Sequence, residues 1–168
     1  MSIALLGAGG KMGLRCTDNL RRTSHDCRFV EISPAGIEQL GRRGVATVPQ
    51  EAALADADVA ILAVPDRLIR AVAAAAVPLL PSGALVMVLD PAAPLAGHLP
   101  DRRDVACVVT HPCHPPVIND ETDPEARRDF FGGIKARQNV VAALQRGGDR
   151  DYALGEEVAR IIFAPVMT

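Results

Sequence analysis

The densest group of chemically versatile side chains lies in residues 110–116 (THPCHPP), in a chain that has only four histidines. Histidine is the usual general acid or base in proteins at neutral pH, so either His111 or His114 is a candidate for that role, and we expect His111 to be catalytic. With Glu121, the two imidazoles could equally hold a divalent metal ion. A third interpretation is a proline-stiffened loop with exposed histidines. The residues alone leave these three interpretations open.

A second group is the glycine-rich segment 7–13 (GAGGKMG), which directly follows a short apolar run. Where a strand turns sharply into a helix, free backbone N–H groups and the positive end of the helix dipole bind a pyrophosphate. The spacing departs from strict G-x-G-x-x-G, and the alternative is an ordinary turn. We predict a dinucleotide site formed by Gly7, Gly9, Gly10, Lys11, Met12 and Gly13.

Two further positions complete the predicted cofactor site, and the cofactor that they favour is NAD. Glu31 ends an apolar run 18 residues after Gly13. A carboxylate there accepts the ribose hydroxyls of NAD and repels the extra phosphate of NADP, although a solvated glutamate is the alternative. Pro65 and Asp66 end another apolar run and are expected beside the nicotinamide half, where a simple helix cap is an equally good interpretation.

Lys135 and Asn139 are four residues apart, so they share one face if the segment is helical. A buried lysine can act as a general base or polarise a carbonyl group, and an asparagine beside it can orient a substrate. We name both as candidate catalytic residues. The alternative is an ordinary helix surface, and Arg137 is a competing candidate for the position of the lysine.

Alternating strands and helices are expected to position these groups. The apolar runs predict strands at residues 3–6, 27–32, 45–48, 58–64, 84–89 and 105–110, with helices at 11–22, 34–44 and 66–76. Because strands and helices alternate, the predicted fold class is α/β, a Rossmann-type doubly wound parallel sheet.

The character of the sequence changes after residue 111. A proline-rich segment at 111–124 predicts an irregular loop, and the apolar patterns of 133–145 and 151–163 predict two helices. We therefore expect a dinucleotide-binding domain at residues 1–131 and the first helices of a truncated all-α domain at residues 132–168.

The composition excludes several classes of protein. The net charge is −2, which argues against nucleic acid or an acidic membrane surface as a partner. No signal-peptide core or uncharged apolar run of membrane-spanning length is visible. The four cysteines show no C-x-x-C spacing, and we interpret them as reduced thiols. We therefore expect a cytoplasmic protein.

Five segments together resemble one family: residues 7–13, 63–65 (AVP), 89–94 (LDPAAP), 111–116 (HPCHPP) and 130–134 (FFGGI). They are similar to the phosphogluconate-dehydrogenase-like branch of the β-hydroxyacid dehydrogenases, and within it to the D-apionate oxidoisomerases. The resemblance implies NAD-dependent oxidation of a small or branched sugar acid such as D-apionate, with an acyl migration. It also favours a metal at His111, His114 and Glu121, because a Lewis acid assists that migration.

The same resemblance implies that Lys135 and Asn139 match the catalytic Lys-x-x-x-Asn pattern, and that the full-length form is a homodimer with a helical second domain. Only the start of that domain is present here. Three alternatives therefore stay open: a truncated NAD-binding module without catalysis, a phosphogluconate-type dehydrogenase, and a metal-dependent hydrolase that uses the histidine segment.

Overall fold

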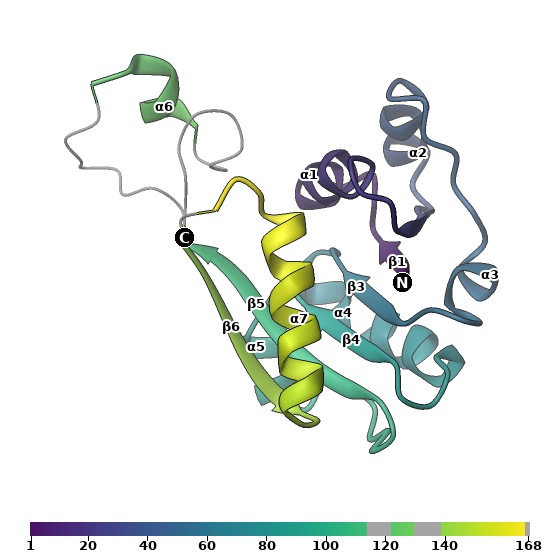
Figure 1. The fold of residues 1–168 in the computed structure, drawn as a ribbon. Coiled ribbons are helices and arrows are strands. Elements are labelled where there is room, and N and C mark those ends of the chain that lie inside the picture. The colour runs from purple at the N-terminus through teal and green to yellow at the C-terminus, as the bar shows by residue number, and fades with distance from the viewer. Residues whose placement is uncertain (114–121, 130–138, 167–168) are drawn as a thin grey trace.

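The computed structural model describes residues 1–113, 122–129 and 139–166, and these residues are built around one six-stranded sheet (Figure 1). The strand order is β2-β1-β3-β4-β5-β6. The first five strands are parallel, and β6 pairs antiparallel with β5. The strands are β1 (Ser2–Leu6), β2 (Asp26–Val30), β3 (Val59–Leu62), β4 (Leu85–Val88), β5 (Ala106–Cys113) and β6 (Asn139–Arg146). The predicted Rossmann-type fold is confirmed.

Helices cover both faces of this sheet. On one face α1 packs against α7, and α7 contacts β4, β5 and β6, while α3 and α4 lie on the other face (Figure 1). The described helices are α1 (Lys11–Leu20), α2 (Pro34–Gly41), α3 (Gln50–Leu54), α4 (Asp66–Ala76), α5 (Ala92–Leu95), α6 (Pro124–Arg128) and α7 (Asp149–Ile162), with a 3₁₀ turn at Val77–Leu79.

The central strands contribute to two separate cores. In β1, Ile3 and Leu5 join the core under α1 and α7, while Ala4 and Leu6 join the core under α3 and α4. Because both faces of a parallel sheet are covered, its strands are apolar without alternation. This is why the short apolar runs in the sequence identify β1, β3, β4 and β5.

The topology places a crevice at the ends of β1 and β3. The chain passes from β1 to β2 on one side and then crosses to β3 on the other side of β1. In open α/β sheets ligands bind outside the carboxyl ends of the strands at such a reversal. The glycine-rich segment follows β1 and residues 63–66 follow β3, so both reach this crevice.

Three predicted elements differ from the structure. The irregular loop predicted over 111–124 begins too early, because β5 continues to Cys113. Residues 45–48 form no strand, because Val48 N–H donates one bond to Phe29 O and the next residue, Pro49, has no N–H to continue a ladder. A helix was predicted over 133–145, but its described part, residues 139–145, belongs to the strand β6. Val140 and Leu144 face the core, while Val141 is 56% exposed. This alternation is typical of a strand, but it is not visible in the sequence because the residues on both faces are apolar.

The C-terminal elements pack into the body of the sheet. Val158, Ala159, Ile162 and Phe163 at the end of α7 are buried in the same core as β1, β3, β4 and β5. A division at residue 131 would therefore separate strands and helix that share one core. The domain boundary itself lies among residues outside the described ranges and stays a prediction.

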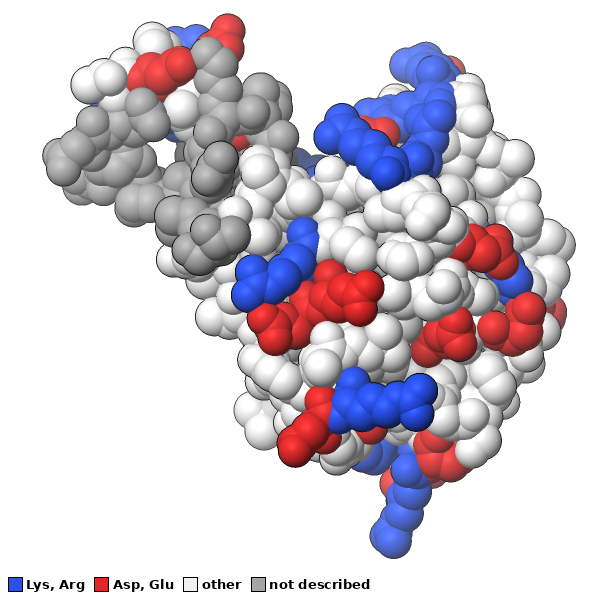
Figure 2. Space-filling model, viewed as in Figure 1, with Lys and Arg blue, Asp and Glu red and all other residues white. Residues whose placement is uncertain are grey.

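The surface carries charges of both signs. Over the face that α7 forms, acidic and basic side chains alternate, and basic side chains gather over α1 and α2 (Figure 2). In the ranges that the structure describes, no helix is long and apolar enough to cross a membrane.

Candidate functional site

Two cavities meet at the crevice between β1 and β3. The first, here the His111 cavity, has a volume of about 290 Å³ and includes Met12, Leu89 and His111 in its lining. The second, here the Glu31 cavity, has a volume of about 340 Å³ and includes Glu31 and Leu68. Both are lined by Gly10, Ala63, Val64 and Pro65. An extended ligand lying across Gly10 could therefore occupy both.

The glycine loop between the cavities is shaped by close backbone contacts. Gly7 has φ +79°, and a Cβ atom there would lie 2.5 Å from Ala63 O. A Cβ on Gly13 would overlap the carbonyl oxygen of Gly7, so only glycine lets α1 start this close to β1. The first turn of α1 lies at this end, and in any α-helix the N–H groups of the first turn point out of the N-terminal end. The loop fits the backbone cradle that a pyrophosphate requires.

Glu31 is held at the mouth of its cavity by four hydrogen bonds. Its Oε2 accepts Gly9 N–H at 2.9 Å, and its Oε1 accepts the backbone N–H groups of Ile32 and Ser33 and the Ser33 hydroxyl, each at 2.9 Å. Burial opposes ionisation of this carboxyl, but the bonds from Ser33, Gly9 and Ile32 outweigh it and lower the pKa of Glu31. The side chain is thus an anion aimed at the cavity.

Apart from Ser33 and Gln50, the rest of the lining of the Glu31 cavity is apolar or backbone. Ile32 is 90% exposed and Leu68 is 42% exposed, although both are large hydrophobic side chains, and Val72 lies beside them in the lining. Exposed apolar side chains around a cavity with one fixed anion suit a flat, partly apolar group that carries hydroxyls.

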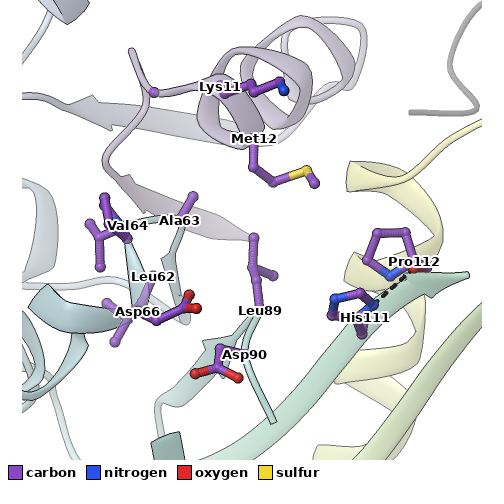
Figure 3. A pocket seen from close by; sticks show the side chains of 12 residues that line it. Lys11, Met12, Leu62, Ala63, Val64, Asp66, Leu89, Asp90, His111 and Pro112 are labelled. Carbon is purple, nitrogen blue, oxygen red and sulfur yellow. Dashed lines mark hydrogen bonds between the residues drawn. The ribbon is translucent and has the colours of Figure 1, made fainter. Parts of the chain in front are cut away.

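The His111 cavity combines apolar walls with four titratable side chains, those of Lys11, Asp66, Asp90 and His111. Met12 and Leu89 lie on one side and His111 on the other, with Asp66 and Asp90 also in the lining (Figure 3). His111 Nδ1 lies 2.8 Å from Pro112 O. Because a carbonyl oxygen only accepts, Nδ1 carries the proton, and Nε2 holds the lone pair when the ring is neutral.

The structure brings most of the predicted cofactor residues to these cavities. Gly7 lines the Glu31 cavity, Gly9 binds Glu31, and Gly13 supports the turn into α1. The remaining predicted residues line one or both cavities: Gly10, Lys11, Met12, Glu31, Pro65 and Asp66. Their contacts with a cofactor stay predictions.

The predicted catalytic and metal residues are only partly described. His114, Glu121, Lys135 and Arg137 lie outside the described residues. Asn139 begins β6 opposite Cys113 and lines a different hollow, between β6 and α7. In the described ranges, no three His, Cys, Asp or Glu side chains are grouped as a metal site would require. The proposed roles of these residues stay predictions.

Several residues of the site were not predicted, among them Asp90, Ser33 and Gly36. Asp90 follows β4 and lines the His111 cavity, where its Oδ1 accepts Ala92 N–H at 2.9 Å. Ser33 and Gly36 begin α2 and contact Glu31. A signal for Asp90 was its place after an apolar run, and a signal for Ser33 was the Ser-Pro helix start.

Comparison with known proteins finds relatives over nearly the whole chain. The chain is 52% identical to the D-apionate oxidoisomerase of Cupriavidus necator and 53% identical to that of Rhizobium rhizogenes, in each case over 98% of this chain and 60% of the relative. The chain therefore spans about 60% of the length of these curated relatives. The model of the family "Phosphogluconate dehydrogenase (decarboxylating) C-term" matches residues 119–168.

Solved structures agree with the fold. A semialdehyde dehydrogenase NAD-binding protein from Cupriavidus necator, crystallised with calcium and NAD, matches with a TM-score of 0.92 and 52% identity, over 98% of this chain and 60% of that one. The 3-hydroxyisobutyrate dehydrogenase of Mycobacterium tuberculosis matches with a TM-score of 0.69 over 98% of this chain and 53% of that one. Its 18% identity shows similarity of fold alone.

Proposed function

The chain is a homologue of the D-apionate oxidoisomerases over about 60% of their length, and we propose that it binds NAD and serves the NAD-dependent oxidation of a small sugar acid such as D-apionate. The observation that carries this proposal is the meeting of two cavities at a glycine loop, with an anionic carboxylate in one and a histidine in the other. The structure of the Cupriavidus necator protein with NAD supports it.

Each part of the crevice has a task in this proposal. The glycine loop and the first turn of α1 bind the pyrophosphate, and Glu31 accepts the hydroxyls of the adenosine ribose. Ile32 and Leu68 contact the adenine ring, while Met12, Pro65, Asp66 and the other residues of the His111 cavity receive the nicotinamide half. When bound, NAD supplies the hydride acceptor.

His111 is the described residue best suited to move a proton. Its Nε2 can take the proton of a substrate hydroxyl during oxidation, since Nδ1 is held by Pro112 O. Lys135 and Asn139 remain proposed catalytic residues on the basis of the family pattern.

A divalent metal ion belongs to the same proposal, because the Cupriavidus necator structure contains calcium. His111, His114 and Glu121 are the proposed ligands, and the metal would polarise the carbonyl of an α-hydroxy ketone during acyl migration. With Nδ1 protonated, Nε2 of His111 can be a metal ligand or a base, but not both at once. If Nε2 binds the metal, a chelator should abolish activity. If Nε2 acts as the base, a chelator should leave activity unchanged.

The test is calorimetric titration with NAD and NADP, followed by assay of D-apionate oxidation with added Ca²⁺ or with chelator. We expect NAD to bind more tightly than NADP. Glu31→Ala should remove this preference, whereas Glu38→Ala, a matched control at an exposed glutamate paired with Arg42, should not. Binding of neither nucleotide would contradict the proposal. Activity that survives chelation would contradict the role of His111 as a ligand of an essential metal ion and leave it available as a base.

Two alternative functions have their own support. A phosphogluconate-type dehydrogenase is favoured by the family model that matches residues 119–168. An NAD-binding module without catalysis is consistent with the glycine loop and the Glu31 cavity, which need only bind the cofactor. Turnover of 6-phosphogluconate would support the first, and NAD binding without any turnover would support the second. The homodimer and the cytoplasmic location stay predictions.

A further inference from the structure

The first turn of α2 contacts both the glutamate and the glycine loop of the proposed cofactor site. Ser33 is the residue before the helix, and Gly36 is the third residue within it. Gly36 is buried, and its backbone lies directly against Gly9. This turn thus joins Glu31 to the loop that follows β1.

Ser33 binds Glu31 and caps the helix at the same time. Its hydroxyl donates to Glu31 Oε1 at 2.9 Å and accepts Gly36 N–H at 3.1 Å. With the backbone N–H groups of Ile32 and Ser33, this gives Oε1 three donors. The saturated Oε1 fixes the plane of the carboxylate, and Oε2 is left to contact Gly9 and the cavity.

Gly36 makes the space that Glu31 occupies. A Cβ atom at position 36 would lie 2.6 Å from Glu31 Cδ and 2.8 Å from Oε2. The third helical position usually favours Glu or Gln, which return a hydrogen bond to the cap residue. Glycine here gives up that bond and leaves room for the carboxylate of Glu31, which directly follows β2.

We propose that Ser33 and Gly36 are positioning residues that make the site select NAD over NADP, by holding the Glu31 carboxylate against Gly9. The inference rests on the proposed binding of NAD. A fixed Oε2 can accept a ribose hydroxyl and repels a phosphate at the same place. A glutamate released from this position can turn away from the phosphate, and the repulsion then falls.

Gly36→Ala is the direct test, with Gly41→Ala as the matched control. Both are glycines of α2, but a Cβ at position 41 would have nothing within 4 Å. The added methyl at position 36 meets the end of a flexible side chain, so we expect Glu31 to move and the fold to persist. Gly36→Ala should weaken NAD binding about tenfold and NADP binding less than threefold, as loss of one charged hydrogen bond predicts. Gly41→Ala should change neither.

A double-mutant cycle separates positioning from general damage. In a Glu31→Ala background, Gly36→Ala should have no further effect on NAD affinity, because the group through which it acts is absent. An equal loss of NAD affinity on Gly36→Ala in the wild-type and Glu31→Ala backgrounds would overturn the inference. So would an NAD affinity of Gly36→Ala equal to that of the wild type. Absence of NAD binding in the wild-type chain would instead overturn the proposed function and the inference together.

Ser33 provides a second, independent test. Ser33→Ala should lower the ratio of NAD to NADP affinity, and Ser33→Thr should restore it, because threonine keeps the hydroxyl and also caps helices. An equally lowered ratio of NAD to NADP affinity in Ser33→Ala and Ser33→Thr would overturn the role of the hydroxyl. Thermal unfolding of each variant, measured beside Gly41→Ala, would verify that the compared proteins are folded.

Discussion

At the scale of single residues, the chemistry of the site depends on how backbone groups hold a few side chains. Glu31 is kept ionised by N–H donors, and His111 is kept in one tautomer by a carbonyl oxygen. Both side chains are therefore oriented before any ligand arrives. Such preorganisation lowers the cost of binding and of proton transfer.

The lowered pKa of Glu31 makes the stability of the fold depend on pH. Its pKa lies below the ordinary value of 4.5 when the chain is folded, because hydrogen bonds outweigh burial. The ionised group thus stabilises the folded state above that value, and this contribution is lost as the pH falls through the folded pKa. We expect Glu31→Gln to lower the free energy of unfolding by about 1 kcal/mol at pH 7. Urea unfolding from pH 7 to pH 3 should show this difference shrinking.

The control for this pH dependence is Glu38→Gln, at an exposed position whose partner is Arg42. A surface pair contributes little, so we expect a change of less than about 0.5 kcal/mol at pH 7. A constant difference between Glu31→Gln and the wild type across the pH range would contradict the assignment of the stabilisation to the ionised carboxylate.

The four free cysteines should react with thiol reagents in a defined order. Burial raises the pKa of Cys16 to about 12 and that of Cys107 to about 11, whereas Cys113 is exposed at the end of β5. Thiolates are the reactive form, so we expect Cys113 to be labelled first and the two buried thiols only on unfolding. Labelling with a disulfide reagent at pH 8 measures this. Cys113→Ser should remove the fast phase, and a fast phase that persists would contradict the prediction.

At the scale of elements, the sequence is sufficient to predict those strands and turns whose structure is determined within a single segment. The apolar runs identify β1, β3, β4 and β5, and the glycines at 7–13 identify the turn into α1. The strand β6 was missed because Val140, Val141 and Leu144 fit a helical stripe as well as a strand. Ser33, Gly36 and Asp90 were missed because their roles arise from contacts between elements, which no single segment encodes.

The packing of α7 on β5 depends on a glycine. A Cβ atom at Gly155 would lie 2.8 Å from both methyl groups of the buried Val108. Overpacking costs about 1–3 kcal/mol, while a helical alanine gains about 1 kcal/mol over glycine. We therefore expect Gly155→Ala to destabilise the chain by about 1 kcal/mol and to lower Tm by about 2–4 °C.

Gly41→Ala is again the matched control, because it makes the same change in a helix with open space around it. It should raise the stability by up to about 1 kcal/mol. Differential scanning calorimetry of the two variants isolates the packing contribution. Equal Tm values for Gly155→Ala and Gly41→Ala would contradict the close approach of α7 to β5.

At the scale of the whole molecule, the last described elements complete the sheet that carries the site. The edge strand β6 pairs along β5, the strand that carries His111, and α7 covers the neighbouring face. The sequence suggested that residues 132–168 begin another domain, because two late apolar segments resemble helices. In the structure, one segment becomes a strand of the same sheet, and the other becomes its covering helix.

A shortened chain that ends at residue 131 tests whether the domain ends there or includes β6 and α7. Removal of the rest would expose the face of β1, β3, β4 and β5 that now packs on Val158, Ile162 and Phe163. Burial of three such side chains contributes about 5–9 kcal/mol, which is comparable to the whole stability of a domain. We therefore expect the shortened chain to lose cooperative unfolding in urea and to bind a hydrophobic dye, while the 168-residue chain unfolds in one transition. A shortened chain that unfolds cooperatively would instead establish residues 1–131 as an independent domain and assign β6 and α7 to the unit that follows.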